Sequence, residues 1–446
     1  MKYTFPNGMY SDVRIEHVFS TAINYTLREM QECKEKKYSA AFIRVYDGKM
    51  WYYASTSDLA GIQGELDALA KLATPNPDIA QTAIYKNHAA HVDTVMAFVG
   101  REASGVPLAD KIALMQKAMP LIEANPYVKL WRLGYEDNYT VKEFYNSKGS
   151  ALCFDYQVCG FRAGFTMMEG ERKMDESFSR ARVTFPDVCG YEPELADLLA
   201  ESQEVLLHSV PVEPGKYSVI FAPFVTGVFV HECFGHKSES DFMIGDEATR
   251  KEWTIGKKVA GDDLSIIETG NILGNGYTPY DDEGNKATFT HLIKDGVLAG
   301  RLHNAASAAD LHEGVTGNGR AMSFEYEPIV RMTTSYIDKG DKTYDQLIAE
   351  TQNGILLKTL AHGSGMSTFT IAPRTAYYVK DGKITTPVRV SVVTGNVFEA
   401  LGDIDGITDR VEMWSFVGGG CGKMEQYPLP VGFGGPYIRV KNMTVQ

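Results

Sequence analysis

Two histidines and a glutamate stand close together in the segment HECFGH, residues 231–236. Zinc sites that catalyse hydrolysis use three protein ligands, an open position for water, and a carboxylate that takes the proton of that water. His231 and His236 are therefore candidate zinc ligands, and Glu232 is the candidate general base. The segment differs from the zinc-protease signature H-E-x-x-H, because three residues lie between Glu232 and His236 instead of two.

The separation of the two histidines by five positions sets a condition on the backbone. On an ideal α-helix five residues turn about 500°, which leaves the two side chains roughly 140° apart and unable to share one ion. A π-type turn, which closes hydrogen bonds five residues apart, returns them to one face. Gly235 also permits a break in the helix. We therefore predict that the helix is widened, or ends, at this site.

Hydrogen-bonded core histidines are the alternative interpretation of this segment. Its context favours a metal, because the helix is apolar up to Val230 and then carries His, Glu, His, Lys, Glu and Asp by residue 241. Burying so many ionisable groups costs free energy unless they are paired or bound to a metal.

A third ligand must come from another part of the chain, and Cys421 is the most distinctive candidate. It lies in FVGGGCGKMEQYPLPVGFGGP, where flanking glycines let the backbone approach another group closely, and a thiolate suits zinc. His88 and His91, with Asp93, are candidates for a separate site, but we interpret them as exposed helix residues. The other histidines considered lie in a predicted helix or a glycine-rich loop: His303, His312 and His362.

Composition narrows the class of protein. The 446 residues carry a formal net charge of -13, which disfavours direct contact with nucleic acid. The longest apolar run, residues 219–230, is too short to span a bilayer, so no membrane association is expected. The N-terminal segment has no apolar signal core, which predicts a cytoplasmic protein. Six scattered cysteines are expected to be thiols rather than a disulfide framework.

The pattern of apolar residues predicts an α+β protein of two domains. Residues 1–210 are expected to form an α/β domain, with two strands in 39–56, helices in 57–73 and 107–125, an antiparallel meander in 127–189 and a helix in 192–209. Ser57 is the expected N-cap of the first helix, and Pro120 the expected kink of the second. Prolines and a glycine at 211–216 mark the boundary.

The second predicted domain, residues 211–446, has a different pattern of apolar residues and glycines. A strand and a nearly all-apolar, hence buried, helix lead into HECFGH, and short strand-like runs alternate with glycine turns from about residue 255 onward. This pattern predicts a β-rich domain whose barrel-like, mostly antiparallel sheet surrounds the buried metal-site helix.

Four motifs together resemble one known family. HECFGHKSESD, DDEGNKATF, GNGRA and GGGCGKMEQYPLPVGFGGPYIRV, in this order, are similar to those of the TldD/PmbA family, metalloproteases historically labelled modulators of DNA gyrase. The resemblance runs nearly end to end and fits the branch that keeps H-E-x-x-x-H. It implies zinc held by His231, His236 and Cys421, Glu232 as general base, and a dimer enclosing the active site, formed with a second copy or with a paralogue that lacks the motif.

The chain also departs from the family pattern. The family more often has Gly-Leu-Glu-Gly-Asp where this chain has Lys237-Ser238-Glu239-Ser240-Asp241, and a glycine triplet appears here as Gly363-Ser364-Gly365. The candidate ligands are untouched, but the substrate length and sequence preference of the family are not assigned to this chain.

The leading hypothesis is a zinc-dependent peptidase acting on peptides or unfolded polypeptides. Arg320 and Arg331 are candidates for holding a substrate carboxylate or peptide carbonyls, although an arginine in a loop is as often part of a structural ion pair. Residues 281–283 (Asp-Asp-Glu) are expected to be turn residues rather than ligands. An extended peptide could bind by adding a strand to the β-rich lining.

Two other hypotheses compete with it. The chain could be a regulatory protein that binds gyrase or a toxin-antitoxin complex, in which case binding would survive the loss of Glu232. Zinc could also be purely structural, in which case a fourth protein ligand would complete its coordination.

Overall fold

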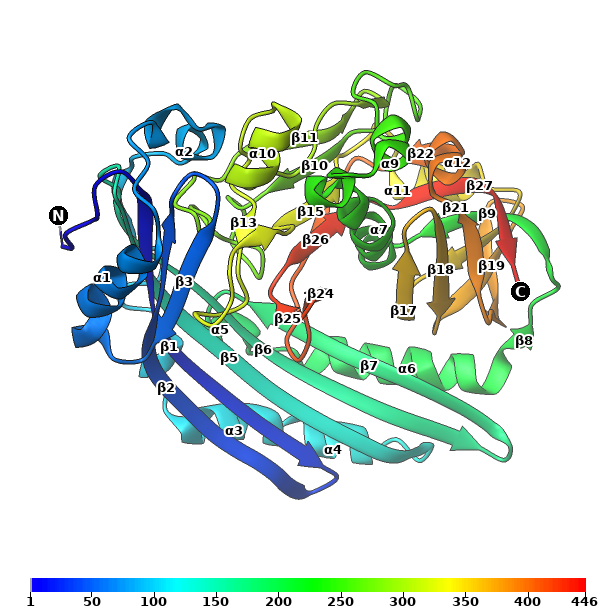
Figure 1. The fold of residues 1–446 in the computed structure, drawn as a ribbon. Coiled ribbons are helices and arrows are strands. Elements are labelled where there is room, and N and C mark those ends of the chain that lie inside the picture. Colours follow the sequence, from blue (N-terminus) through cyan, green and yellow to red (C-terminus); the bar gives the residue numbers. More distant parts are fainter. Residues whose placement is uncertain (1) are drawn as a thin grey trace.

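Four long strands shape the N-terminal half of the computed structural model, which describes residues 2–446. They pair antiparallel in the order β2-β1-β5-β6 and belong to a seven-stranded sheet (Figure 1). Its strands are β1 (Tyr10–Thr26), β2 (Glu29–Tyr46), β3 (Trp51–Thr56), β4 (Val92–Val95), β5 (Val128–Asn146), β6 (Ala151–Glu169) and β7 (Arg172–Arg182). The predicted hairpin and meander are confirmed, but the domain is not α/β in the strict sense, because only β4 pairs parallel.

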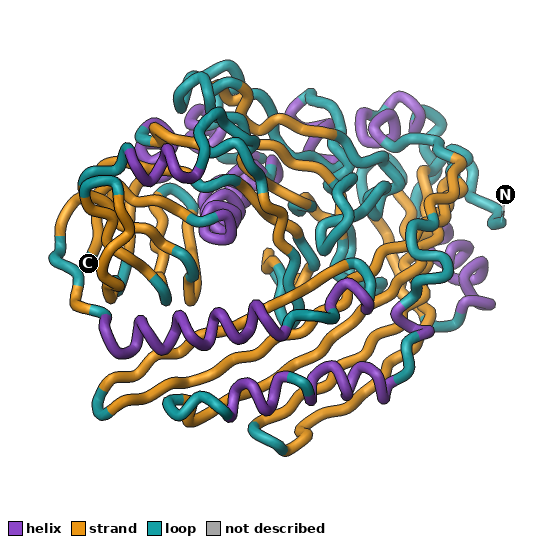
Figure 2. Tube along the Cα trace, turned by 180° about the vertical axis from the view of Figure 1, so that it is seen from behind, coloured by secondary structure: helices purple, strands orange, loops and turns teal. Residues whose placement is uncertain are grey.

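Amphipathic helices cover one face of this sheet, as Figure 2 shows from behind. Apolar residues of α3, α4 and α6 share a core with the sheet, including Leu114, Ile122 and Leu195. The helices of this half are α1 (Ile62–Leu72), α2 (Ala83–Asn87), α3 (Leu108–Gln116), α4 (Ala118–Glu123), α5 (Phe185–Val188) and α6 (Glu192–His208).

Two details of the predicted helices differ from the structure. Asp58, rather than Ser57, caps the short 3₁₀ turn before α1, because its side chain accepts a hydrogen bond from the backbone N–H of Ala60. The predicted long helix divides at Lys117 instead of kinking at Pro120. Pro120 lies in the first turn of α4, where its missing N–H breaks no intrahelical hydrogen bond.

The C-terminal half contains two larger sheets. The ten-stranded sheet comprises β8 (Val210–Pro211), β9 (Gly215–Phe221), β16 (Asn353–Leu357), β17 (Leu360–Gly365), β18 (Thr368–Pro373), β19 (Ala376–Lys380), β20 (Lys383–Arg389), β21 (Val393–Asn396), β22 (Ile404–Ile407) and β27 (Ile438–Val445). The six-stranded sheet comprises β10 (Ile266–Thr269), β11 (Phe289–Lys294), β12 (Val297–Leu298), β15 (Thr334–Ile337), β23 (Glu412–Trp414) and β26 (Gly432–Gly435).

Short pairs and helices complete this half. The two-stranded pairs are β13 (Gly319–Arg320) with β14 (Ile329–Val330), and β24 (Cys421–Lys423) with β25 (Gln426–Leu429). The helices are α7 (Pro223–Phe229), α8 (His236–Ser238), α9 (Glu247–Glu252), α10 (Ala305–Leu311), α11 (Tyr344–Ala349) and α12 (Val397–Gly402). None of the helices in residues 2–446 is both long enough and apolar enough to cross a membrane.

The sheets do not close into the expected barrel. The ten-stranded sheet runs from β17 to β8, and each of these end strands has a single neighbour. Both pairing directions occur in it, since β9–β16 and β8–β20 are parallel. Closure requires a continuous hydrogen-bonded circuit, which these strands do not make. The C-terminal half is therefore an α+β arrangement of separate sheets.

The buried helix predicted from the apolar run lies between the two larger sheets. It begins at Pro223, a favoured first residue of a helix, and its buried side chains Val225, Phe229 and Phe234 belong to the main core. Gly227 lets β26 approach closely, because a Cβ at this position would lie 2.5 Å from the ring of Phe433. Packing on both sides thus fixes the direction of the helix that carries HECFGH.

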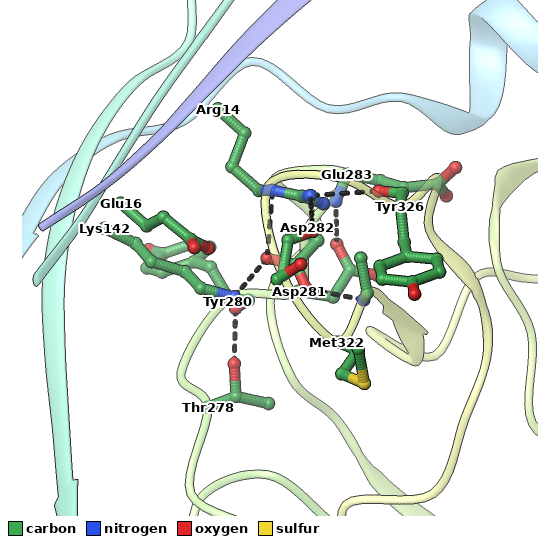
Figure 3. A network of polar contacts seen from close by, with 12 residues as sticks. Arg14, Glu16, Lys142, Thr278, Tyr280, Asp281, Asp282, Glu283, Met322 and Tyr326 are labelled. Carbon is green, nitrogen blue, oxygen red and sulfur yellow. Dashed lines mark hydrogen bonds and ion pairs between the residues drawn. The ribbon is translucent and has the colours of Figure 1, made fainter. Parts of the chain in front are cut away.

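A buried ionic network joins the two halves at the turn of residues 281–283 (Figure 3). The carboxylate of Asp282 accepts hydrogen bonds from Lys142 of β5 and from the backbone N–H of Ala321, and lies 3.8 Å from Nε of Arg14 of β1. Burial opposes ionisation of Asp282, but Lys142 and Arg14 lower its pKa to about 2. Glu283 pairs in the same way with Arg44 at 3.2 Å.

The expectation that these acidic residues form a turn is confirmed. Asp281 does stabilise a turn, since it accepts hydrogen bonds from the backbone N–H groups of Glu283, Asn285 and Gly319. All three acidic side chains are also buried, and Asp282 and Glu283 anchor the C-terminal half on basic side chains of the N-terminal sheet.

Candidate metal centre

A π-helical turn, Val230–Gly235, links α7 to α8. The backbone N–H of His236 donates to the carbonyl of His231, which is the five-residue hydrogen bond that the spacing demanded. The rings of the two histidines lie on the same side, with their centroids 5.0 Å apart. The prediction of a widened turn is confirmed. Gly235 serves close packing rather than a break, because a Cβ there would lie 2.1 Å from the sulfur of Met332.

Cys421, the first residue of β24, meets the two histidines. One potential ligand atom from each of His231, His236 and Cys421 lies within 4.8 Å of the others. The thiol sulfur is 3.4 Å from Nε2 of His236. The structure thus brings together the three side chains that the sequence singled out, from segments far apart in the chain.

Protonation in the metal-free state is set by mutual contacts. Burial acts to raise the pKa of the Cys421 thiol, but hydrogen bonds with His231 and His236 outweigh it and lower the pKa from 9.0 to about 5. Burial acts to lower the pKa of His236, but contacts with Cys421 and Glu239 raise it from 6.5 to about 10. Without metal, Cys421 and His236 therefore form a thiolate–imidazolium pair from about pH 5 to about pH 10.

This pairing has a direct spectroscopic consequence. In metal-free protein, the thiolate absorbance of Cys421 near 240 nm is expected to appear around pH 5 rather than 9. The stability contributed by the depressed thiol pKa is lost as pH falls through 5, and that contributed by the raised His236 pKa is lost as pH rises through 10. A pH titration of Cys421→Ser should lack the step near pH 5, and an unchanged step in this variant would refute the assignment.

Charged side chains behind His236 hold its ring in place, and these side chains were not predicted from the sequence. Nδ1 of His236 lies 3.1 Å from the buried carboxylate of Glu239, so the opposite nitrogen faces Cys421. Lys423 lies 3.4 Å from Glu239 and also bonds to Asp241 at 2.6 Å. A carboxylate behind a ligating histidine fixes its tautomer and orientation. The signal available in the sequence was a glutamate three positions after His236, within one turn of it.

Glu232 directly follows the candidate ligand His231 in the chain but is not a member of the converging group. It is half-buried and lies on the same partly exposed face of the helix as His236. β17 runs past it, because a Cβ added to Gly363 would lie 3.8 Å from Cγ of Glu232. Cγ of Glu232 therefore lies beside an edge strand of the ten-stranded sheet.

The candidate substrate-binding arginines have structural partners instead. Arg331 is fully buried, and its guanidinium donates to the carbonyls of Cys421 at 2.7 Å and Gln426 at 3.2 Å. Arg320, also buried, donates to the carbonyls of Met332 and Pro430. Both guanidinium groups hold backbone carbonyls in this arrangement, and neither forms the ion pair named as the alternative within residues 2–446. Their role in substrate binding stays a prediction.

The remaining histidines do not join the centre. His88 was expected to be exposed, but it is fully buried and stacks on Tyr10 with ring centroids 4.0 Å apart. His303 is also buried, and bonds to Ser240, Ser307 and Glu313. Within residues 2–446, His231, His236 and Cys421 are the one group of three or more metal-binding side chains that comes together in this way. All six cysteines are free thiols.

The loop before Cys421 also contacts the N-terminal sheet. The backbone N–H of Gly418 donates to Glu136 of β5 at 3.0 Å. Gly160 of β6 leaves room for Val417, because a Cβ there would lie 2.4 Å from its side chain. Both halves of the molecule thus position the cysteine.

Comparison with known proteins agrees with this geometry. The family model described as the PmbA/TldA metallopeptidase C-terminal domain matches residues 214–446, and the model for domain 1 of the same family matches residues 11–74. The chain belongs to the PmbA/TldA metallopeptidase family. The histidine pair and the cysteine motif both lie within the first of these matches, as the resemblance of the four motifs predicted.

Individual relatives cover most or nearly all of the chain. A protein named metalloprotease from Methanothermobacter thermautotrophicus is 29% identical over 462 residues, covering 98% of this chain and 95% of the relative. A protein named zinc metalloprotease TldD homolog from Saccharolobus solfataricus is 29% identical over 328 residues, covering 72% of each.

Two solved structures share the fold. A protein from Thermotoga maritima described as a modulator of a DNA gyrase superimposes with a TM-score of 0.79 at 17% identity, over 98% of this chain and 96% of that one. TldE from Thermococcus kodakarensis superimposes with a TM-score of 0.75 at 16% identity, over 98% of this chain and 96% of that one. At these identities the likeness concerns the fold alone.

Proposed function

We propose that this protein is a zinc-dependent peptidase that hydrolyses peptides or unfolded polypeptides. The observation that carries the proposal is the convergence of His231, His236 and Cys421 within 4.8 Å at a π-turn that also contains Glu232. The names of the relatives, metalloprotease and zinc metalloprotease, point in the same direction.

The donor set fits zinc. Imidazole nitrogen and thiolate sulfur are the ligands that zinc prefers, and a thiolate is already favoured here before a metal binds. Structural zinc sites usually have four protein ligands, whereas catalytic sites have three and keep one position open. The group in residues 2–446 has three members, which supports a catalytic rather than a structural ion.

Each nearby side chain has a role in this proposal. Zinc, when bound, would lower the pKa of a coordinated water from about 15.7 to about 7 and polarise the scissile carbonyl. Glu232 takes the proton from the attacking water and gives it to the leaving amine. Glu239 keeps His236 oriented with Nε2 toward the centre, and Arg331 holds the carbonyl of Cys421.

The edge strand β17 is the proposed support for the substrate backbone. An end strand keeps unpaired N–H and C=O groups, which an extended peptide can meet by strand addition. This mode reads backbone more than side chains and suits unfolded chains. Assembly with a second copy or with a related chain that lacks the histidine pair belongs to the same proposal.

Removal and return of the metal test the proposal. Protein purified without chelator is expected to contain about one zinc per chain and to cleave an unfolded polypeptide such as reduced casein. Dialysis against a chelator should abolish cleavage, because the water loses its activation, and stoichiometric zinc should restore it. Metal analysis and quantitative peptide mapping provide the two readouts. Protein that takes up no zinc, or cleavage that a chelator does not affect, would exclude a zinc peptidase.

A further inference from the structure

The helix that carries Glu232 has one narrow, partly exposed face. Between residues 223 and 238, every residue is buried except Phe224, Val228, Glu232 and His236. These four follow one another at intervals of four, so they form a single stripe along the helix. Two members are apolar and two belong to the proposed active site. The stripe therefore runs from the two proposed active-site residues directly onto the two apolar side chains.

Aromatic side chains widen the apolar end of the stripe. The ring of Phe224 contacts Trp414 of β23 edge-to-face, with centroids 5.3 Å apart, and lies 5.7 Å from Phe433. Phe416 packs on Phe433 in turn, at 5.7 Å. Phe224, Trp414 and Phe416 are all partly exposed. An apolar surface that stays open beside ionisable groups marks a site for a ligand or a partner.

A glycine keeps the middle of the stripe open. Gly363 of β17 lies beside Val228, and a Cβ on it would come within 2.9 Å of Cγ1 of Val228. The same Cβ would lie 3.8 Å from Glu232. A larger residue would therefore cover the junction between the apolar and the catalytic part of the stripe. The apolar stripe therefore borders the same space as β17, the edge strand proposed to bind the peptide backbone.

Distances along the helix define which part of a substrate reaches the apolar side chains. At a rise of 1.5 Å per residue, Val228 lies about 6 Å and Phe224 about 12 Å from Glu232 along the axis. An extended peptide rises about 3.3 Å per residue. Val228 is therefore within reach of the first or second substrate residue from the scissile bond, and Phe224 of the third or fourth.

We infer that Phe224, Val228 and Trp414 form a specificity subsite for large apolar side chains on one side of the scissile bond. The inference rests on the proposed peptidase function and names the substrate class of that same site. The occupant is a segment of unfolded polypeptide with aromatic or aliphatic residues within about four positions of the cleaved bond. Such segments are buried in folded proteins, so the subsite would favour chains that have lost their structure.

Cleavage of a randomised peptide library by the zinc-loaded protein, read by mass spectrometry, tests the subsite. Wild type is expected to prefer aromatic and aliphatic over charged residues by about 100-fold at one or more of these positions on a single side of the bond. Phe224→Asp should lose the preference at the third and fourth positions and gain one for lysine and arginine there. The matched control is Phe289→Ala, because Phe289 is an exposed phenylalanine of β11, 56% accessible; its profile should equal that of wild type.

The possible outcomes separate this inference from the proposed function. If no peptide is cleaved in a zinc-dependent way, the peptidase function itself fails. If wild type cleaves but accepts charged and apolar residues equally on both sides, the subsite is refuted. An unchanged profile in Phe224→Asp also refutes the role of Phe224. Should this variant not fold, Phe224→Leu replaces it and is expected to shift the preference from aromatic to aliphatic residues.

Discussion

Glu232→Gln is expected to lower kcat/KM for peptide hydrolysis by about 10²–10⁴, the usual contribution of general acid–base catalysis. Glutamine keeps the size and hydrogen-bonding capacity of the side chain but cannot take a proton from the attacking water. Zinc content should stay at wild-type level, because Glu232 is not among the three converging ligand residues. The measurement pairs quantitative cleavage of an unfolded polypeptide with metal analysis of the same sample.

Two comparisons make this result specific. Glu247→Gln removes an exposed carboxylate from the first turn of α9 and should leave both cleavage and zinc unchanged. Loss of zinc together with loss of activity in Glu232→Gln would instead assign the carboxylate to metal binding. Full activity in Glu232→Gln would remove it from the catalytic role, and would favour the regulatory alternative if binding of a partner protein persisted.

Cys421→Ser is expected to reduce zinc from about one ion per chain to nearly none and to abolish hydrolysis. The thiolate is the one anionic member of the ligand group, and its pKa of about 5 makes it available at neutral pH. A serine hydroxyl stays protonated at that pH and is a poor ligand for zinc. Metal analysis after gel filtration, followed by competition with a zinc-sensitive dye, gives the stoichiometry and the loss of affinity.

The control for this substitution is Cys33→Ser, which removes an exposed free thiol of β2 outside the converging ligand group. It should keep both zinc and activity. Serine is similar in size to cysteine but cannot form the thiolate that pairs with His236, so at neutral pH the metal-free variant should unfold at a lower temperature than metal-free wild type. A Cys421→Ser protein that retained stoichiometric zinc would show that the sulfur is not a ligand and would overturn the proposed centre.

Local spacing was enough to predict the most unusual feature of the backbone. Two histidines five apart cannot share a face of an α-helix, and the π-turn that resolves this conflict involves hydrogen bonds between neighbours in sequence. The same holds for β2–β3, α1 and α6, whose periodicity is a local property. Cys421 was identified because glycines flank it and because four motifs together resembled a family.

Only the tertiary structure decided the surroundings of these residues. Lys423 reaches Glu239, and Arg331 reaches the carbonyl of Cys421, across long stretches of chain. His88 is buried because it stacks on Tyr10 of the first strand. Such partners are brought together by packing between elements far apart in the chain. This packing does not produce a repeating pattern of residues from which it could be predicted. For the same reason the pattern of short strands indicated a β-rich half without revealing that its sheets stay open, since closure depends on which strand ends pair rather than on how many strands form.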